Sequence, residues 1–130
     1  MIVLDTHAII WLGENPARLS RAATQAIRNS QNASERLTAS TVSLYEIAWC
    51  VLRGRIDSTL SVRELLTSIE HVFTAVPPNA DIVLAAAQLP STFPSDPFDR
   101  IIAATAMTSG AALITADERI RRSGAMRTIW

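Results

Sequence analysis

The stretch from Ile2 to Leu12, IVLDTHAIIWL, indicates how the chain folds. Its first three residues form an unbroken apolar run, which is typical of a strand buried on both faces of a parallel sheet. The run ends directly at Asp5, and Thr6 offers a hydroxyl that can cap a helix over residues 7–14. A buried strand, an aspartate directly after it and then a helix together predict an α/β domain with an acid at the carboxyl end of its sheet.

The same alternation of strand and helix continues along the chain. Apolar runs predict further strands over 37–40, 71–76, 111–115 and 126–130. Helices are expected from Ser20 to Asn29, from a cap at Thr41 or Ser43 to Arg53, over 62–70 and 80–89, from a cap at Asp96 to Gly110, and briefly after Asp117. We therefore expect residues 1–130 to form a single three-layer domain, in which a mostly parallel sheet of about five short strands carries helices on both faces.

The composition narrows the class of protein. Hydrophobic residues make up 48% of the chain, as expected for a globular domain. No apolar run approaches the roughly 20 residues that cross a membrane. The first residues lack a basic segment and a small-residue cleavage site, and the single Cys50 cannot form an internal disulfide, so we expect a cytoplasmic protein that does not contact the membrane.

The formal net charge is zero, but the basic residues are all of one type. All 12 basic residues are arginine, and there is no lysine. If several of the 12 acids gather in one pocket, an arginine excess remains elsewhere, and the arginine fork suits phosphate groups. The alternative is that arginine usage only reflects the composition of the genome.

Four carboxylates are expected at one edge of the sheet. Asp5 and Asp117 follow the first and fourth expected strands, and Asp99 lies in the first turn of the helix that precedes the fourth. Glu46 is the only acid in an otherwise apolar helix, on a stripe that it shares with Ser43. Because the carboxyl ends of parallel strands meet at one edge, these side chains should share a crevice there.

Carboxylates that gather in one crevice repel each other and need a cation. Oxygen ligands favour Mg²⁺ or Mn²⁺, and the absence of a Cys/His cluster argues against zinc. Such an ion can lower the pKa of a bound water and neutralise a phosphodiester transition state.

Each acid also has a purely structural interpretation. Asp5 can be an ordinary residue at a helix start, Asp117 can cap its own helix, and Glu46 can pair with a buried arginine. Asp96, followed by Pro97, is explained better as a helix cap than as a ligand, and Asp99 can simply be an acid of the first helical turn.

Four ordered motifs resemble a known family. IVLDTHAIIWL, SLYEIAWCVLRGRI, DPFDRIIAATAMTSGAALITAD and the terminal TIW together resemble the PIN-domain ribonucleases, most closely the VapC-type toxins of bacterial toxin–antitoxin pairs. The resemblance spans nearly the whole chain. It implies a PIN-like fold and Mg²⁺- or Mn²⁺-dependent cleavage of RNA by a toxin that a small antitoxin protein inhibits, with a homodimer as the expected assembly.

The resemblance also assigns roles to residues. It implies that Asp5, Glu46, Asp99 and Asp117 are the catalytic and metal-binding acids, and that the hydroxyl residues Thr6 and Thr115 line the same site. Ser43 and Asp96 are expected to support it. The family chemistry needs no histidine, so we expect His7 to pack or to face solvent, His71 to lie on an edge strand or loop, and Trp11, Trp49 and Trp130 to serve the core or an interface.

Three other classes of protein place acids in a similar way. A response-regulator receiver domain needs a lysine, which the chain lacks, and a haloacid-dehalogenase phosphatase needs Asp-x-Asp where this chain has Asp5-Thr6-His7. The third is a catalytically silent binding module whose acidic pocket holds a partner's arginine. Metal-dependent RNA cleavage that is lost in Asp5→Asn separates it from the nuclease.

Overall fold

The computed structural model describes residues 1–130 and contains one five-stranded sheet. The strands are β1 (Ile2–Leu4), β2 (Leu37–Ser40), β3 (Phe73–Val76), β4 (Ala112–Ile114) and β5 (Thr128–Ile129). Their order across the sheet is β3-β2-β1-β4-β5, and every neighbouring pair is parallel. The chain moves outward from β1 in one direction and then returns to its other side with β4, so a crevice opens beyond the carboxyl ends of β1 and β4.

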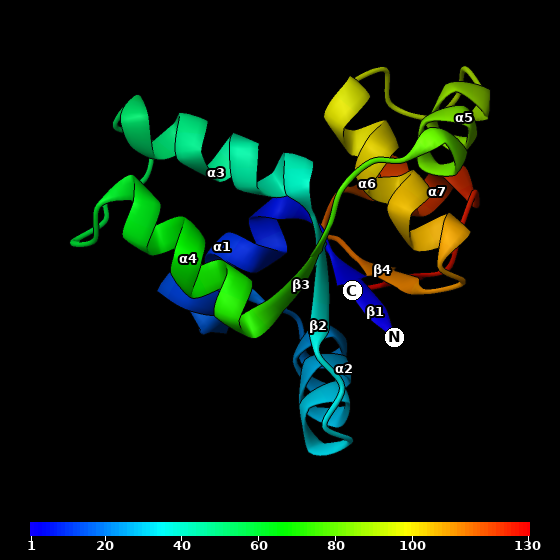
Figure 1. The fold of residues 1–130 in the computed structure, drawn as a ribbon. Coiled ribbons are helices and arrows are strands. Elements are labelled where there is room, and N and C mark those ends of the chain that lie inside the picture. The colour runs from blue at the N-terminus through cyan, green and yellow to red at the C-terminus, as the bar shows by residue number, and fades with distance from the viewer.

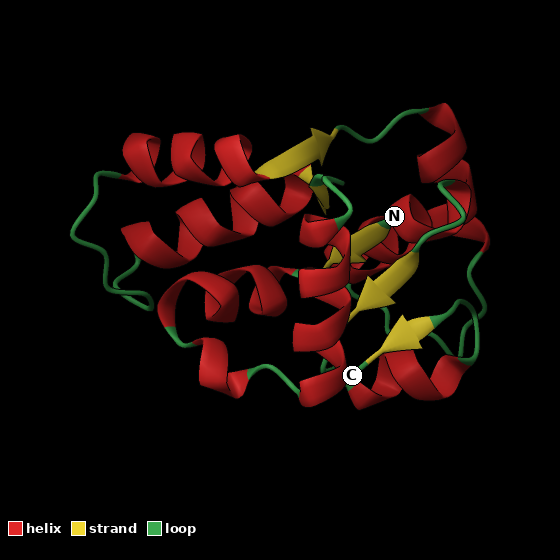
Figure 2. Cartoon of the chain, turned by 90° about the horizontal axis from the view of Figure 1, so that it is seen from below, coloured by secondary structure: helices red, strands yellow, loops and turns green.

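Seven α-helices and one 3₁₀ turn connect the strands. They are α1 (Thr6–Glu14), η1 (Pro16–Arg18), α2 (Arg21–Asn32), α3 (Thr41–Leu52), α4 (Val62–Val72), α5 (Ala80–Gln88), α6 (Pro97–Thr108) and α7 (Glu118–Ser123). Figure 1 shows α1, α3 and α4 on one side of the sheet and α5, α6 and α7 on the other, and Figure 2 gives the same layers from below. The expected three-layer α/β domain is therefore confirmed.

Alternate residues of the central strand β1 pack into two separate hydrophobic cores, one on each face of the sheet. Ile2 and Leu4 pack with α1 to α4, whereas Val3 packs with α6 and α7 on the opposite face. All three side chains are buried, which explains why the strand is apolar without interruption. This two-sided burial fixes the position of Asp5, the residue directly after the strand.

The structure corrects several expected boundaries and caps. Helix α2 runs to Asn32 and not to Asn29, and His71 lies in α4 because β3 begins only at Phe73. Ser40, and neither Thr41 nor Ser43, caps α3 by accepting a hydrogen bond from the Val42 amide. The expected cap of α1 is also one residue too late. Asp5, and not Thr6, caps this helix, because the Asp5 carboxylate accepts a hydrogen bond from the amide of Ala8.

The helix that carries Glu46 is less buried than its composition predicts. Only Ser43, Leu44 and Ile47 of α3 are buried, whereas Tyr45 is 57% exposed and Leu52 is 72% exposed. An apolar residue in this helix therefore does not imply a core contact.

None of the helices is both long enough and apolar enough to span a membrane.

Candidate active site

A pocket of about 580 Å³ opens at the carboxyl edge of β1 and β4. Five acids, two arginines and two aromatic rings are among its lining residues, which are Asp5, Thr6, His7, Trp11, Arg18, Glu46, Asp96, Asp99, Ala116, Asp117, Arg119 and Ile120. The pocket thus brings together the four acids expected to share a crevice, with Asp96 beside them. Ser43 and Thr115 do not line the pocket, but they form hydrogen bonds with the Thr6 hydroxyl and the Asp117 amide, both of which belong to residues that do.

Asp5 is held in place by the start of α1. Its Oδ1 accepts a hydrogen bond of 2.8 Å from the amide of Ala8. Burial raises the pKa of Asp5, and Asp117 adds a smaller repulsion, while a hydrogen bond from the Thr115 hydroxyl opposes the rise. The helix cap therefore explains where Asp5 points but does not remove the cost of burying its charge.

Glu46 reaches the pocket from the middle of α3. Its Oε1 accepts a short hydrogen bond of 2.6 Å from the Thr6 hydroxyl, and the Ser43 hydroxyl lies 3.1 Å from the same Thr6 oxygen. Desolvation raises the pKa of Glu46, with further repulsion from Asp96 and Asp5. None of the molecule's three ion pairs includes Glu46, so its interpretation as the partner of a buried arginine is wrong.

Asp96 is the helix cap that the sequence predicts, and Asp99 lies in the same turn without a capping role. Oδ1 of Asp96 caps α6, because it accepts from the amides of Phe98 at 2.8 Å and Asp99 at 3.3 Å. The Asp99 carboxylate makes no hydrogen bond to the protein, and burial together with repulsion from Asp96, Glu46 and Asp117 raises its pKa to about 7. A carboxyl group that is this costly to ionise needs a cation when it is charged.

Asp117 differs from the other acids because it already has a cation. Arg119 donates from Nη2 to Oδ2 at 2.9 Å and from Nε to Oδ1 at 3.3 Å, and its amide also donates to Oδ1. The hydrogen bonds from Arg119 hold the pKa of Asp117 below its ordinary value. Asp117 also caps α7, so its structural interpretation is correct, although the carboxylate still faces the pocket.

The carboxylate oxygens that line the pocket are ligands of the type that a hard divalent cation prefers. All five acids present carboxylate oxygens, which Mg²⁺ and Mn²⁺ prefer, and the raised pKa values of Asp5, Glu46 and Asp99 reflect charge that little in the protein offsets. As the side chains stand, however, no three acidic, histidine or cysteine groups are close enough together to share one ion. The expectation that four acids converge directly is therefore too strong, because Asp5 and Asp117 are turned toward helix amides and Arg119.

Arg100 is a positioning residue that the sequence reasoning missed. Its guanidinium donates to five backbone carbonyls, one in the last turn of α5 and four in the connection to α6, among them Pro94 at 2.9 Å and Leu89 at 3.0 Å. The connection that it holds leads directly into Asp96 and Asp99. An arginine that binds backbone carbonyls leaves no recognisable sequence pattern. The only hint in the sequence is that Arg100 directly follows Asp99.

Aromatic residues that were expected to serve the core also reach this pocket. Trp11 lines it, with the His7 ring 5.7 Å from the indole and the Arg18 guanidinium carbon 4.4 Å from the ring centroid. Trp130 packs 5.7 Å from the same indole, so Trp11 joins the core to the pocket wall.

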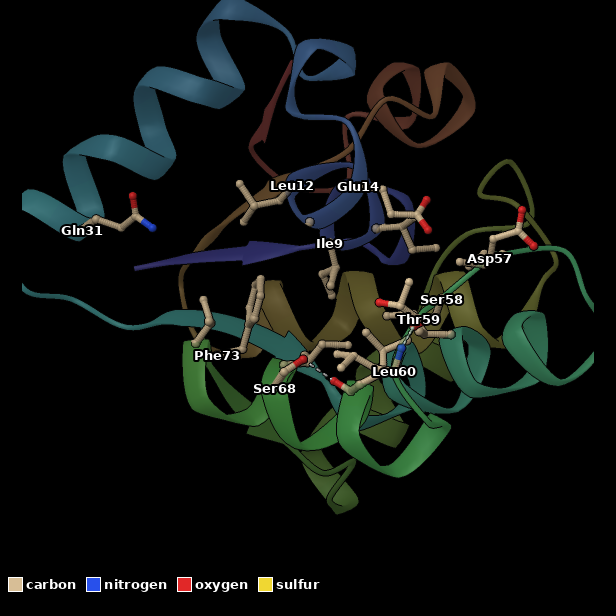
Figure 3. A pocket seen from close by; sticks show the side chains of 17 residues that line it. Ile9, Leu12, Glu14, Gln31, Asp57, Ser58, Thr59, Leu60, Ser68 and Phe73 are labelled. Carbon is tan, nitrogen blue, oxygen red and sulfur yellow. Dashed lines mark hydrogen bonds between the residues drawn. The ribbon is translucent and has the colours of Figure 1, made fainter.

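A second cavity lies on the other side of α1 and has a different character. It measures about 590 Å³ and has ten hydrophobic residues among the 17 that line it, most of them from α1, α4 and the segment before α4, with single residues from α2, α3 and β3. Figure 3 shows Leu12, Ile9, Leu60 and Phe73 around the hollow, with the carboxylates of Glu14 and Asp57 toward one end. No cluster of acids occurs here, so this cavity offers an apolar surface and not a catalytic one.

Comparison with known proteins identifies the family. The model of the PIN domain matches residues 2–125. The chain belongs to the PIN-domain family. Within that family it is 38% identical to Ribonuclease VapC22 of Mycobacterium tuberculosis, over 99% of this chain and 98% of the relative.

Solved structures share the fold of this PIN domain at low sequence identity. The chain superposes with a TM-score of 0.74 on a structure of VapBC2 from Rickettsia felis bound to a promoter DNA fragment, at 14% identity over 98% of this chain and 97% of the other. VapBC-1 from nontypeable Haemophilus influenzae gives a TM-score of 0.72 at 24% identity, over 98% and 96% of the two chains. The PIN-like three-layer fold expected from the motifs is thus confirmed.

Proposed function

We propose that this PIN-domain protein is an endoribonuclease, the toxin of a toxin–antitoxin pair, that hydrolyses RNA phosphodiester bonds in the cytoplasm with Mg²⁺ or Mn²⁺. The observation that carries the proposal is the group of acids at the carboxyl edge of β1 and β4, of which Asp5, Glu46 and Asp99 have raised pKa values and no cation partner. The relation to a ribonuclease of the VapC group supports the same conclusion.

The proposed ligands are Asp5, Glu46, Asp99 and Asp117. An ion held by these carboxylates would lower the pKa of a bound water and offset the charge that develops on the phosphate. Thr6 orients Glu46 by donating to Oε1, and Thr115 supports both Asp5 and the amide of Asp117. Asp96 fixes the first turn of α6 and so places Asp99.

Glu46→Gln tests the assignment because the variant separates charge from structure. The amide oxygen of glutamine can still accept the Thr6 hydrogen bond, while the change removes one charge from a repulsive group, so metal-free thermal stability should be unchanged or higher. RNA cleavage in Mg²⁺ or Mn²⁺ should fall by at least about a hundredfold.

Melting by circular dichroism and cleavage of a mixed single-stranded RNA provide the two measurements. Chelation of the metal should abolish cleavage by the wild-type protein, as should Asp5→Asn. A Glu46→Gln protein that melts early yet cuts RNA at the wild-type rate would show that Glu46 is structural. Wild-type protein that binds a partner but cuts no RNA with either ion would favour the silent binding module.

The same proposal includes an inhibitory antitoxin that docks on the apolar cavity of Figure 3. Supporting it, the structural neighbours from Rickettsia felis and Haemophilus influenzae are VapBC assemblies, and a structure from Klebsiella pneumoniae is a toxin–antitoxin complex. Leu60 at 42% and Val72 at 48% exposed leave apolar surface at the cavity for a partner to cover. An amphipathic helix that lays its apolar face in such a groove is a common mode of recognition.

Leu60→Asp tests this docking with Leu52→Asp as its matched control. Both leucines are exposed, but only Leu60 lines the cavity. Co-purification with the small protein encoded immediately upstream should be lost in Leu60→Asp and kept in Leu52→Asp, while RNA cleavage by the isolated protein is kept in both. Equal retention of the partner would place the antitoxin elsewhere.

A homodimer is the assembly we propose for the free protein. Helix α5 supports it, because Val83 at 52% and Leu84 at 57% exposed place two large apolar side chains on its outer surface. Sedimentation of the wild-type protein and of Leu84→Asp tests the assembly, and a monomeric wild-type protein would contradict it.

A further inference from the structure

We propose that Arg18, held against the face of Trp11, binds a phosphate of the RNA strand next to the bond that is cut. The inference rests on the proposed ribonuclease function, because it names how the substrate of that same pocket is held. It concerns the one wall of the pocket that carries positive charge without a carboxylate partner.

The two arginines that line the pocket are in different states. Arg119 is occupied by Asp117, to which it donates two side-chain hydrogen bonds. Arg18 lines the same pocket, yet it makes no ion pair and no side-chain hydrogen bond within the protein. Its charge is therefore available to a ligand, although five carboxylates line the same hollow.

Trp11 keeps the Arg18 guanidinium in place. The guanidinium carbon lies 4.4 Å from the indole centroid, and cation–π attraction of this kind orients an arginine without consuming its hydrogen-bond donors. The indole is itself fixed by Trp130 at 5.7 Å. A planar fork that is pre-oriented with free donors suits bidentate binding of a phosphate.

The position of Arg18 fits the substrate better than it fits an isolated anion. Arg18 follows α1 in η1, whereas the proposed metal ligands follow β1 and β4 or lie in α3 and α6, so the arginine stands at the side of the acidic group. An RNA strand carries one phosphate per nucleotide, and a strand whose scissile phosphate meets the acids must place a neighbouring phosphate beside them. A cation at that point offsets the repulsion between the acids and the RNA backbone.

Arg18→Ala tests the proposal, and Arg53→Ala is its matched control. Arg53 also lies on an indole, but outside the pocket: its guanidinium carbon is 4.2 Å from the centroid of Trp49, which Arg55 contacts as well at 4.7 Å. Cleavage of a mixed single-stranded oligoribonucleotide in Mg²⁺ should show KM raised by about tenfold in Arg18→Ala with kcat nearly unchanged, since an interaction made equally in ground and transition states affects binding alone. Arg53→Ala should behave as the wild type.

Salt dependence gives a readout that a structural role of Arg18 would not move. An arginine that neutralises one phosphate of a single strand contributes about 0.7 to the slope of log KM against log salt. The slope for Arg18→Ala should be smaller by this amount, and Arg18→Lys should restore the slope and part of the KM. Thermal melting of the variants checks that the fold is kept, and a folded Arg18→Lys keeps the test informative if the alanine variant unfolds.

Distinct outcomes overturn the inference and the function beneath it. If the wild type cuts RNA and Arg18→Ala matches it in KM and salt slope, or if Arg53→Ala loses as much, Arg18 does not hold the substrate. If Arg18→Ala cuts normally but no longer retains the small protein encoded upstream, the arginine serves that partner and the assignment to RNA is wrong. If the wild type cuts no RNA with either ion, the proposed function itself fails and the inference falls with it.

Discussion

Asp96 and Asp99 stand three residues apart in the sequence and do different work at the start of α6. The first satisfies two backbone amides, and the second has no hydrogen bond of its own and a pKa raised to about 7. Millimolar Mg²⁺ should therefore raise the melting temperature of the wild type through linkage, and Asp99→Asn should lose most of that increment. Asp96→Asn should lose little of it.

Asp96→Ala completes the comparison at the residue scale. This variant removes a helix cap and should cost about 1 kcal/mol of stability whether or not metal is present. Calorimetry of the three variants with Mg²⁺ and with a chelator measures all of these effects. An equal loss of the Mg²⁺ increment in Asp96→Asn and Asp99→Asn would contradict the division between cap and ligand.

At the scale of elements, the connection between α5 and α6 depends on one side chain. Arg100 donates to four carbonyls of this segment and to that of Ala86 in the last turn of α5. Arg100→Ala should cost about 2–3 kcal/mol of unfolding free energy, because hydrogen bonds to a charged group are stronger than neutral ones.

Arg100→Lys separates the charge of this residue from its shape. Lysine keeps the cation but cannot spread donors over five carbonyls, so it should recover only a minor part of the loss. Chemical denaturation measures the stability of both variants, and hydrogen exchange of the amides after Leu89 reports the connection itself. Full recovery in the lysine variant would mean that charge alone matters here.

The sequence predicts the elements better than it predicts what their side chains do. Five strands and the acidic positions follow from apolar runs and their ends, because two-sided burial leaves a clear pattern, as in Ile2–Leu4. The pattern does not show that Asp5 takes the capping role expected of Thr6, because both residue types are good helix caps. In the structure the Thr6 hydroxyl donates to Glu46 instead. Contacts between segments far apart in the sequence, such as Thr6 with Glu46, are set by packing and leave no local signal.

At the scale of the whole molecule, the acidic pocket links stability to pH. Burial and mutual repulsion raise the pKa values of Asp5, Glu46 and Asp99 in the folded protein, the last to about 7. A group with a raised pKa binds a proton in the folded state that the unfolded chain has already released. For Asp99 the resulting contribution to stability is fully present below about pH 4 and is lost as the pH rises through about 7, and Asp5 and Glu46 act in the same direction. Asp117 has the opposite shift, but it titrates below its ordinary value of 3.8 and outside this window.

The metal-free protein should therefore become less stable as the pH rises from about 5 to about 8, and Mg²⁺ should reverse the trend. The reversal is expected because the ion binds deprotonated carboxylates and competes with protons for them, so its stabilising effect grows over the same interval. Melting temperatures at several pH values, with a chelator and with millimolar Mg²⁺, measure both slopes. Asp99→Asn should flatten the metal-free slope, since asparagine does not titrate, and a metal-free wild type whose stability rises toward about pH 8 would show that these carboxylates are already neutralised within the protein.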